Sequence, residues 1–338
     1  MWDTLVFAIN AIMPIILLII LGYFLKRINF FNDQFLKSGN TFVFRVALPV
    51  LLFYNIYNIQ SFSNIDWSAV IYSELIVILF FFIGCVIVKL FVHDSRQKGV
   101  VLQCVVRSNF AIIGLPLAES LGGSEAIGIA SVLSAFLIPT FNILGVISLS
   151  IYTKGENEKL NLKSTFFKIL KNPLIIGVVT GLVALAIRSI IPLNDSGNLI
   201  FSIKNDLPFL YKAIENLGKI ASPLALIILG GTFNFNQVKG MFKEIAIGTT
   251  SRIVLVPLVG IGLGVILSKY TNLINFDKTI YPALISLLGS PVAVSSAIMA
   301  REMDNDGDLA GQLVVWTSIF SIFTIFITVV ILRSIGLL

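Results

Sequence analysis

Ten long apolar stretches constrain this chain more than any other feature. A helix needs about 20 mostly apolar residues to cross the hydrocarbon core of a bilayer. Only 12% of the 338 residues are charged, whereas soluble domains carry roughly 25%. The sequence therefore predicts an all-α integral membrane protein with ten transmembrane helices. The expected spans are 5–25, 38–57, 70–92, 100–120, 126–152, 172–191, 219–235, 246–267, 280–300 and 309–333.

Lysine and arginine are distributed unevenly between the connectors. Thirteen follow the odd-numbered spans and five follow the even-numbered spans. Cytoplasmic loops of membrane proteins are enriched in these residues, so we expect a multi-pass protein of the cell membrane with both termini extracytoplasmic. Orientation also accounts for the formal charge of +6, and we expect no nucleic-acid partner.

Three prolines recur in the same order in the two halves of the chain. A repeat of five spans places its second copy upside down, and inverted repeats are typical of secondary transporters. The pattern predicts a first repeat over 1–152, a cytoplasmic loop over 153–171 and a second repeat over 172–338. The paired residues are Pro14 with Pro173, Pro49 with Pro223, and Pro116 with Pro291.

Two glycine–proline segments lie in the middle of expected spans. Gly114 and Pro116 interrupt the fourth span, and Gly289, Ser290 and Pro291 interrupt the ninth. Glycine tolerates unusual backbone angles and proline removes a helical N–H, so we expect both helices to open there. An opened helix must line protein or a watery cavity, and the N-terminus of a half-helix attracts anions. For either segment alone, a simple proline kink is the alternative.

Small polar side chains accompany these segments. Asn109 precedes Pro116, Ser286 and Ser290 flank Gly289, and Asn142 lies in the fifth span. Asparagine and serine can bind a carboxylate without the desolvation cost of a fixed charge. We predict that they contact a ligand, although side chains of this kind also bridge neighbouring helices.

Charged residues inside the expected spans supply further candidates. Charges in a membrane are costly and are usually functional. Arg107 is the best placed to attract an anion, and Arg45 and Arg252 are further candidates. Glu74 either binds a proton for coupling or lies at the level of the headgroups.

The residues favour no catalytic or cofactor chemistry. No phosphate-binding loop, Cys/His cluster or triad pattern occurs, so we expect no enzyme, no cofactor and no metal site. The acidic run 304–308 lacks the glutamate that closes a calcium loop. We expect this run to be a connector that caps the last span.

Several short motifs together resemble one family. They are R-S-N…G-L-P-L over 107–117, A-L-P-V-L-L-F over 47–53, S-P-L-A-L-I-I-L-G over 222–230, and the proline at Pro291. In order and spacing the chain resembles the auxin efflux carrier family, which includes plant PIN proteins and bacterial malate or malonate carriers. The resemblance implies two inverted five-helix repeats in a fold similar to bile-acid symporters and sodium/proton antiporters. It also implies that the fourth and ninth spans are broken and cross at Pro116 and Pro291.

The resemblance further implies a division of labour between the spans. Spans 1, 2, 6 and 7 would form a scaffold that usually dimerises, and spans 3–5 and 8–10 a moving transport domain. Asn109 matches an asparagine that contacts the substrate carboxylate, and Glu74 matches an acidic support residue if a small gap is allowed. The region 153–171 is short compared with the central loop of the plant carriers.

Together the residues and the resemblance predict an elevator-type secondary transporter for a small carboxylate-bearing anion, either malate/malonate-like or auxin-like. The expected partners are this anion, the lipid bilayer and a second copy in a homodimer. A sodium-coupled organic anion symporter of the same fold and a non-transporting membrane ligand sensor remain open alternatives.

Overall fold

The computed structural model describes residues 2–58, 66–152, 171–192, 200–233, 240–271, 273–274 and 276–338. Within these residues the regular structure is helical, apart from one isolated β-bridge. Seven helical segments among them are long and apolar enough to cross a membrane, as expected for an all-α integral membrane protein. They are Asp33–Tyr57, Trp67–Phe91, Phe110–Ile151, Pro173–Ile190, Pro208–Thr232, Phe242–Tyr270 and Gly307–Ser334.

The three other expected spans, 5–25, 100–120 and 280–300, are not among these seven segments. Helix α1 (Trp2–Arg27) is continuous over 26 residues. The stretches 100–120 and 280–300 are divided, so that α5 (Ser95–Val106), α13 (Ile280–Gly289) and α14 (Ser295–Glu302) are each too short to cross a bilayer alone. The count of ten spans and their inverted repeat therefore stay predictions. The predicted loop 153–171 lies, except for its last residue, outside the described residues.

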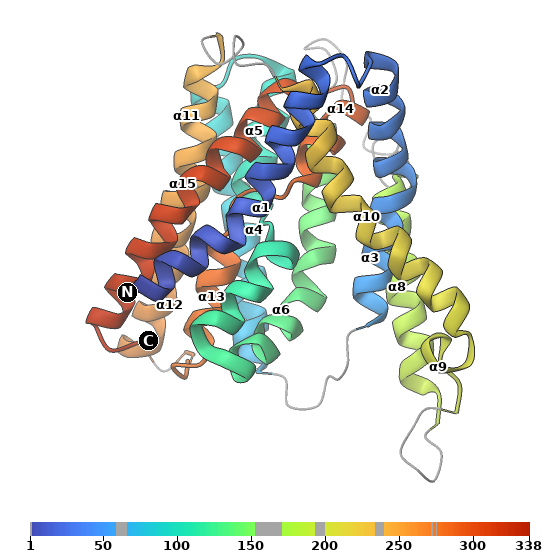
Figure 1. Cartoon of the computed structure of the whole chain (residues 1–338). Helices are drawn as coiled ribbons and strands as arrows, with labels where there is room; N and C mark the ends of the chain where they lie inside the picture. Colours follow the sequence, from blue (N-terminus) through green and yellow to red (C-terminus); the bar gives the residue numbers. More distant parts are fainter. Residues whose placement is uncertain are drawn as a thin grey trace.

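The other helices complete the chain in order (Figure 1). They are α2 (Asp33–Phe42), η1 (Val43–Ala47), α3 (Leu48–Tyr57), α4 (Trp67–Phe91), η2 (Phe110–Gly114), α6 (Leu115–Ile151), α8 (Pro173–Ile190), α9 (Ile203–Asp206), α10 (Pro208–Thr232), α11 (Phe242–Thr250), η4 (Ser251–Leu255), α12 (Val256–Tyr270) and α15 (Gly307–Ser334). Helix α6 contains a turn at Gly122 and Gly123, where Gly123 has a φ of 65° that favours glycine.

Acidic and amide side chains in the connectors cap the N-termini of several helices. Asp66, Asp94 and Asn172 accept hydrogen bonds from the first backbone N–H groups of α4, α5 and α8. Asp306 accepts from the Leu309 N–H at 2.9 Å and caps α15. These bonds satisfy donors that a helix cannot satisfy itself. The prediction that the acidic run 304–308 caps the last helix is therefore confirmed.

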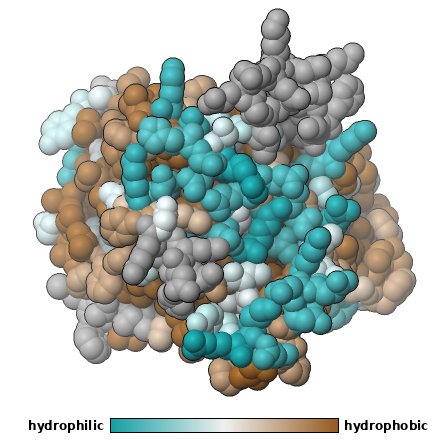
Figure 2. Space-filling view, turned by 90° about the horizontal axis from the view of Figure 1, so that it is seen from above, coloured by the Kyte–Doolittle hydropathy of each residue, from teal (hydrophilic) through white to brown (hydrophobic). Residues whose placement is uncertain are grey.

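The outer surface suits a lipid environment. Large apolar side chains such as Leu17, Phe82 and Leu258 are more than half exposed along the flanks, and contiguous apolar surface of this kind marks a membrane or protein contact. Figure 2 shows hydrophilic side chains gathered across one end of the molecule, with hydrophobic ones around its sides. Helix α1 begins and α15 ends close together at the opposite end in Figure 1.

Glycine contacts hold helices of the two halves together. A Cβ atom at Gly230 in α10 would lie 1.9 Å from the Ile19 carbonyl oxygen of α1, and one at Gly22 would lie 2.0 Å from the Ile227 oxygen. On α8, a Cβ at Gly177 would lie 2.6 Å from the Pro49 oxygen of α3. Small residues permit such close backbone approach, which favours association between membrane helices.

Three wide π-turns precede three prolines. In η1, η2 and η4 the closing N–H bonds to the carbonyl five residues back, and a proline follows two residues after each segment, at Pro49, Pro116 and Pro257. A proline ring clashes with the carbonyl four residues before it in a regular helix. The wider turn relieves this clash, so that the helix continues through the proline instead of ending there.

Candidate functional site

The chain crosses itself at two non-helical segments, 107–109 and 290–294. Ser108 and Val292 form an antiparallel β-bridge between them. The first segment follows α5 and the second lies between α13 and α14. The bridge consists of two backbone hydrogen bonds, from the Asn109 N–H to the Pro291 oxygen at 2.8 Å and from the Ala293 N–H to the Arg107 oxygen at 3.3 Å.

The first break does not lie where the sequence predicted it. Gly114 is helical, with φ −66° and ψ −48°, and Pro116 sits in the first turn of α6. The prediction of an opening at these residues is wrong, because the π-turn η2 accommodates the proline. The backbone opens about two turns earlier, at 107–109. In the second half the break follows Gly289 directly.

Arg252 holds the C-terminal ends of the two broken helices. This residue of η4 is 2% exposed. Its guanidinium donates to backbone oxygens of both halves, namely those of Val105 (3.2 Å), Leu287 (3.2 Å), Leu288 (3.4 Å) and Ser290 (3.0 Å). A cation is favoured at helix C-termini, where carbonyls lack partners. Arg252 therefore stabilises the crossing.

The N-terminal ends of the continuing helices meet at a cavity of about 210 Å³. The start of η2 contributes Asn109, Ala111 and Ile112, and the start of α14 contributes Val294 and Ser295. First-turn N–H groups lack helical partners, and they carry the positive end of the helix dipole. Two helix N-termini directed at one cavity create a site that favours an anion.

Arg107 adds a full positive charge to this cavity. Its side chain lines the cavity and is almost completely buried, at 4% exposure. One guanidinium nitrogen donates to Asn142 Oδ1 at 2.8 Å and another to the Met299 sulfur. In the part of the chain that the structure describes, no carboxylate lies within ion-pair distance of Arg107. A buried charge normally has a partner.

Asn109 presents an unsatisfied donor at the same place. It lines the cavity at 3% exposure, and its Nδ2 atom has no hydrogen-bond partner among the described residues. Buried polar groups without partners are rare and need an explanation. Asn142, which also lines the cavity, orients Arg107 and donates its own amide to the Ile138 oxygen at 2.7 Å.

Six predicted site residues lie outside the cavity lining: Gly114, Pro116, Ser286, Gly289, Ser290 and Pro291. Ser286 is fully buried, and its hydroxyl donates to the Ala283 oxygen at 2.7 Å. A Cβ at Gly114 would lie 2.9 Å from the Ser286 oxygen, so that α13 packs directly on η2. These residues shape the crossing and do not line the cavity.

The three other predicted charges lie elsewhere. Arg252 lies on η4 and donates to backbone oxygens beside the crossing. Glu74 is half-buried on α4 and accepts a hydrogen bond from the Thr140 hydroxyl at 3.1 Å. Arg45 is exposed on η1, 4.0 Å from a carboxylate oxygen of Glu302. Neither Glu74 nor Arg45 lines the cavity.

Helix α10 supplies cavity residues that sequence reasoning missed. Lys219 and Ser222 line the cavity, whereas the seventh span was predicted to begin only at 219. In fact α10 begins at Pro208. The ion pairs of Glu215 with Lys212 and Lys219 lie in its first half, and because of these charges the apolar stretch in the sequence begins later than the helix. Charges of opposite sign three and four residues apart are the signal that could have revealed it.

The apolar flanks, the membrane-length helices and the crossing at a buried cavity define an integral membrane protein built around an internal site. The chain belongs to the membrane transport protein family, the auxin efflux carrier family, whose sequence profile matches residues 7–329. The predicted resemblance is thereby confirmed. Membership identifies a transporter rather than an enzyme.

Three curated proteins are similar to this chain over most of its length. An uncharacterised transporter of Methanothermobacter thermautotrophicus is 23% identical over 94% of this chain and 95% of its own length. One of Methanocaldococcus jannaschii is 23% identical over 94% of this chain and 96% of its own length. The lysosomal cholesterol signaling protein of Mus musculus is 25% identical over 86% of this chain, which corresponds to 34% of that protein.

Proposed function

We propose that the protein is a secondary transporter that carries a small organic anion with a carboxylate group, malate/malonate-like or auxin-like, across the cell membrane. The observation that carries this proposal is the unpartnered Asn109 Nδ2 atom, buried at the wall of the cavity beside Arg107. A carboxylate accepts hydrogen bonds without donating. It would satisfy Asn109, the first-turn N–H groups and the Arg107 charge together.

An elevator movement is the mechanism that we propose. The scaffold would consist of α1, α2–α3, α8 and α10, and the moving domain of α4–α6 and α11–α15, in two inverted repeats of five spans. The lining of the cavity supports this division, because the scaffold helices α3, α8 and α10 contribute Leu51, Leu174 and Ser222. The moving domain contributes Asn109 of the crossing and Ser295 of α14. A ligand between two bodies can be carried by one past the other.

The polar end in Figure 2 supports a cytoplasmic assignment for that face. The described connector between α1 and α2 lies at this end and follows Lys26 and Arg27, and connectors rich in such residues favour the cytoplasm. The termini would then be extracytoplasmic. A homodimer formed through the scaffold belongs to the same proposal.

Binding to the purified protein tests the site. Asn109→Ala removes one donor to a charged acceptor, which contributes about 1.5–3 kcal/mol. We therefore expect at least tenfold weaker binding of the best anion in a thermal-shift or calorimetric titration. Unchanged affinity in this variant would show that the anion does not bind at Asn109 and would contradict the proposed site.

Ser318→Ala is a matched control for that substitution. Ser318 on α15 also has a buried oxygen without a partner among the described residues, but it does not line the cavity. We expect its anion affinity to equal that of the wild type. A similar loss in both variants would attribute the effect to general destabilisation.

A ligand sensor is the second candidate, favoured by the similarity to the lysosomal cholesterol signaling protein. A transporter moves the bound anion across the membrane, whereas a sensor binds it without moving it. Sealed proteoliposomes that take up the bound anion support a transporter, whereas saturable binding without uptake supports a sensor.

A further inference from the structure

Two positive residues from different helices line the candidate cavity. Among the described residues of the lining, Arg107 and Lys219 carry charge, and no acidic side chain belongs to it. Arg107 comes from the crossing, whereas Lys219 comes from α10. The asparagine and the helix N-termini that favour an anion all lie on the Arg107 side, so that Lys219 has no assigned role.

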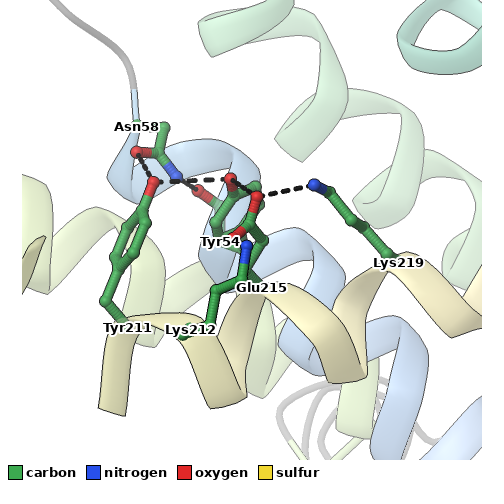
Figure 3. Close-up of polar contacts among 6 residues, drawn as sticks. All are labelled: Tyr54, Asn58, Tyr211, Lys212, Glu215 and Lys219. Carbon is green, nitrogen blue, oxygen red and sulfur yellow. Dashed lines mark hydrogen bonds and ion pairs between the residues drawn. The ribbon is translucent and has the colours of Figure 1, made fainter. Parts of the chain in front are cut away.

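Lys219 belongs to a polar cluster between α3 and α10 (Figure 3). Its ammonium lies 2.6 Å from Glu215 Oε1, and that of Lys212 lies 2.8 Å from Glu215 Oε2. The Tyr54 hydroxyl donates to Glu215 Oε1 at 3.3 Å. Tyr211 extends the cluster by donating to Asn58 Oδ1 at 2.8 Å.

Glu215 has more polar partners in this cluster than Lys219 has. The Glu215 side chain is 14% exposed and has three partners, whereas Lys219 pairs with this one carboxylate in the described part of the chain. If Lys219 turned away, Lys212 and Tyr54 would still satisfy the carboxylate. The three charges also sum to one excess positive charge, which the cluster itself does not neutralise. The Lys219 side chain is 63% exposed, so its ammonium can exchange Glu215 for another anionic partner without leaving a buried charge unpaired.

We propose that Lys219 is a specificity-determining residue that binds a second anionic group of the substrate, and that this group replaces Glu215, with which Lys219 otherwise pairs. This inference rests on the proposed function. The first carboxylate binds at Asn109 and Arg107, and the second replaces Glu215 as the partner of Lys219. The preferred substrates therefore carry two anionic groups spaced to bridge the walls.

The exchange also connects substrate charge to the two bodies of the proposed elevator. A dianion contacts the crossing and α10 together, whereas a monoanion contacts the crossing alone. Selectivity between the two thus depends on the ammonium of Lys219 and not on the crossing.

Matched ligands test the inference with the full-length protein in nanodiscs. The probes are malonate, succinate and glutarate, the monomethyl ester of each, and indole-3-acetate. Each ester keeps the chain length and one carboxylate but loses the second charge. We expect wild-type protein to bind at least one dicarboxylate at least tenfold more tightly than its ester.

Lys219→Met keeps most of the side-chain volume and removes the charge. We expect it to lose at least tenfold in affinity for the dicarboxylate, to bind the ester within about twofold of wild type, and thus to abolish the selectivity. Lys219→Arg restores most of it. Glu215→Gln removes the competing carboxylate, and we expect tighter dicarboxylate binding.

Lys212→Met is the control, because Lys212 pairs with the same carboxylate but does not line the cavity. Its selectivity should equal that of the wild type. A merely structural Lys219 would lower thermal stability and leave the ratio of affinities unchanged, which would overturn the inference. Binding of only monoanions by wild type would overturn it and leave the proposed function standing. Binding of none of the probes would overturn both.

Discussion

Arg252 illustrates how a single residue can take the place of an ion. Half-helix C-termini and unwound carbonyls near a crossing are the groups that coordinate coupling sodium in many transporters. In this chain four such oxygens accept hydrogen bonds from the Arg252 guanidinium. The positive charge that a bound cation would supply is therefore part of the polypeptide.

Sodium dependence follows from this arrangement. Because the carbonyls around Arg252 are already occupied, we expect anion uptake into proteoliposomes to remain within about twofold when sodium is replaced by potassium or choline. The measurement is initial uptake rate at constant pH and ionic strength. A strict requirement for sodium would instead favour the sodium-coupled symporter and require a cation site elsewhere.

The residues of the crossing side could be predicted from the sequence, since Arg107, Asn109 and Asn142 are polar groups inside apolar runs. Lys219 could not be predicted in this way. Its place depends on α10 lying against α3, and this contact between distant segments has no local signature. Glu74 and Arg45 also lie in apolar stretches and were predicted to be site residues, yet their side chains have partners away from the cavity.

At the scale of the helix, the three π-turns explain why one prediction failed. A Gly–x–Pro pattern within an apolar run predicts an opening, yet η2 widens by one residue and carries the chain through Pro116. The same device occurs before Pro49 and Pro257. The opening at 107–109 depends on its bridge to Val292, which only the assembled fold supplies. Helix positions were nevertheless predictable, because membrane spans are set by apolar length.

Helix contacts through glycine predict a sharp contrast in stability. Gly230→Ala would press a methyl group against the Ile19 carbonyl, which lies 1.9 Å from the ideal Cβ position. We expect it to destabilise the protein by about 3 kcal/mol or more, because α1 and α10 would have to separate. Thermal unfolding in detergent, followed by circular dichroism, measures the effect.

Gly262→Ala is the control for this substitution. Gly262 lies within α12, and a methyl group added there would meet no described atom within 4 Å. Alanine is a better helix former than glycine, so this change should stabilise the protein by about 0.5–1 kcal/mol. Equal destabilisation by both substitutions would contradict the close contact of α1 with α10.

At the scale of the whole molecule, one carboxylate joins the two proposed bodies at the polar end. Glu302, the last residue of α14, accepts hydrogen bonds from Asn40 Nδ2 and Thr41 Oγ1, both at 2.9 Å, and lies 4.0 Å from Arg45. The same helix begins at the cavity. A negative charge at a helix C-terminus is unfavourable without such partners, so these contacts stabilise the end of α14 against α2 and η1. We call this set of contacts of Glu302 the latch.

Removal of the latch should loosen this end. For Glu302→Ala we expect faster amide hydrogen exchange in Asp33–Phe42 and Ser295–Glu302, by about tenfold, measured by mass spectrometry. Glu125→Ala, at an exposed position on α6, should leave both segments unchanged. Unaltered exchange in the Glu302 variant would argue against a latch.

The β-bridge between Ser108 and Val292 has a consequence for biosynthesis. Its two segments are separated by more than half of the chain, so that synthesis of the first half yields only part of the cavity lining, while α8, α10 and residues 293–295 follow later. Residues 107–109 can form this bridge only after residues 290–294 have been synthesised. A chain that ends before residue 290 therefore cannot form the crossing, even if its first helices insert correctly.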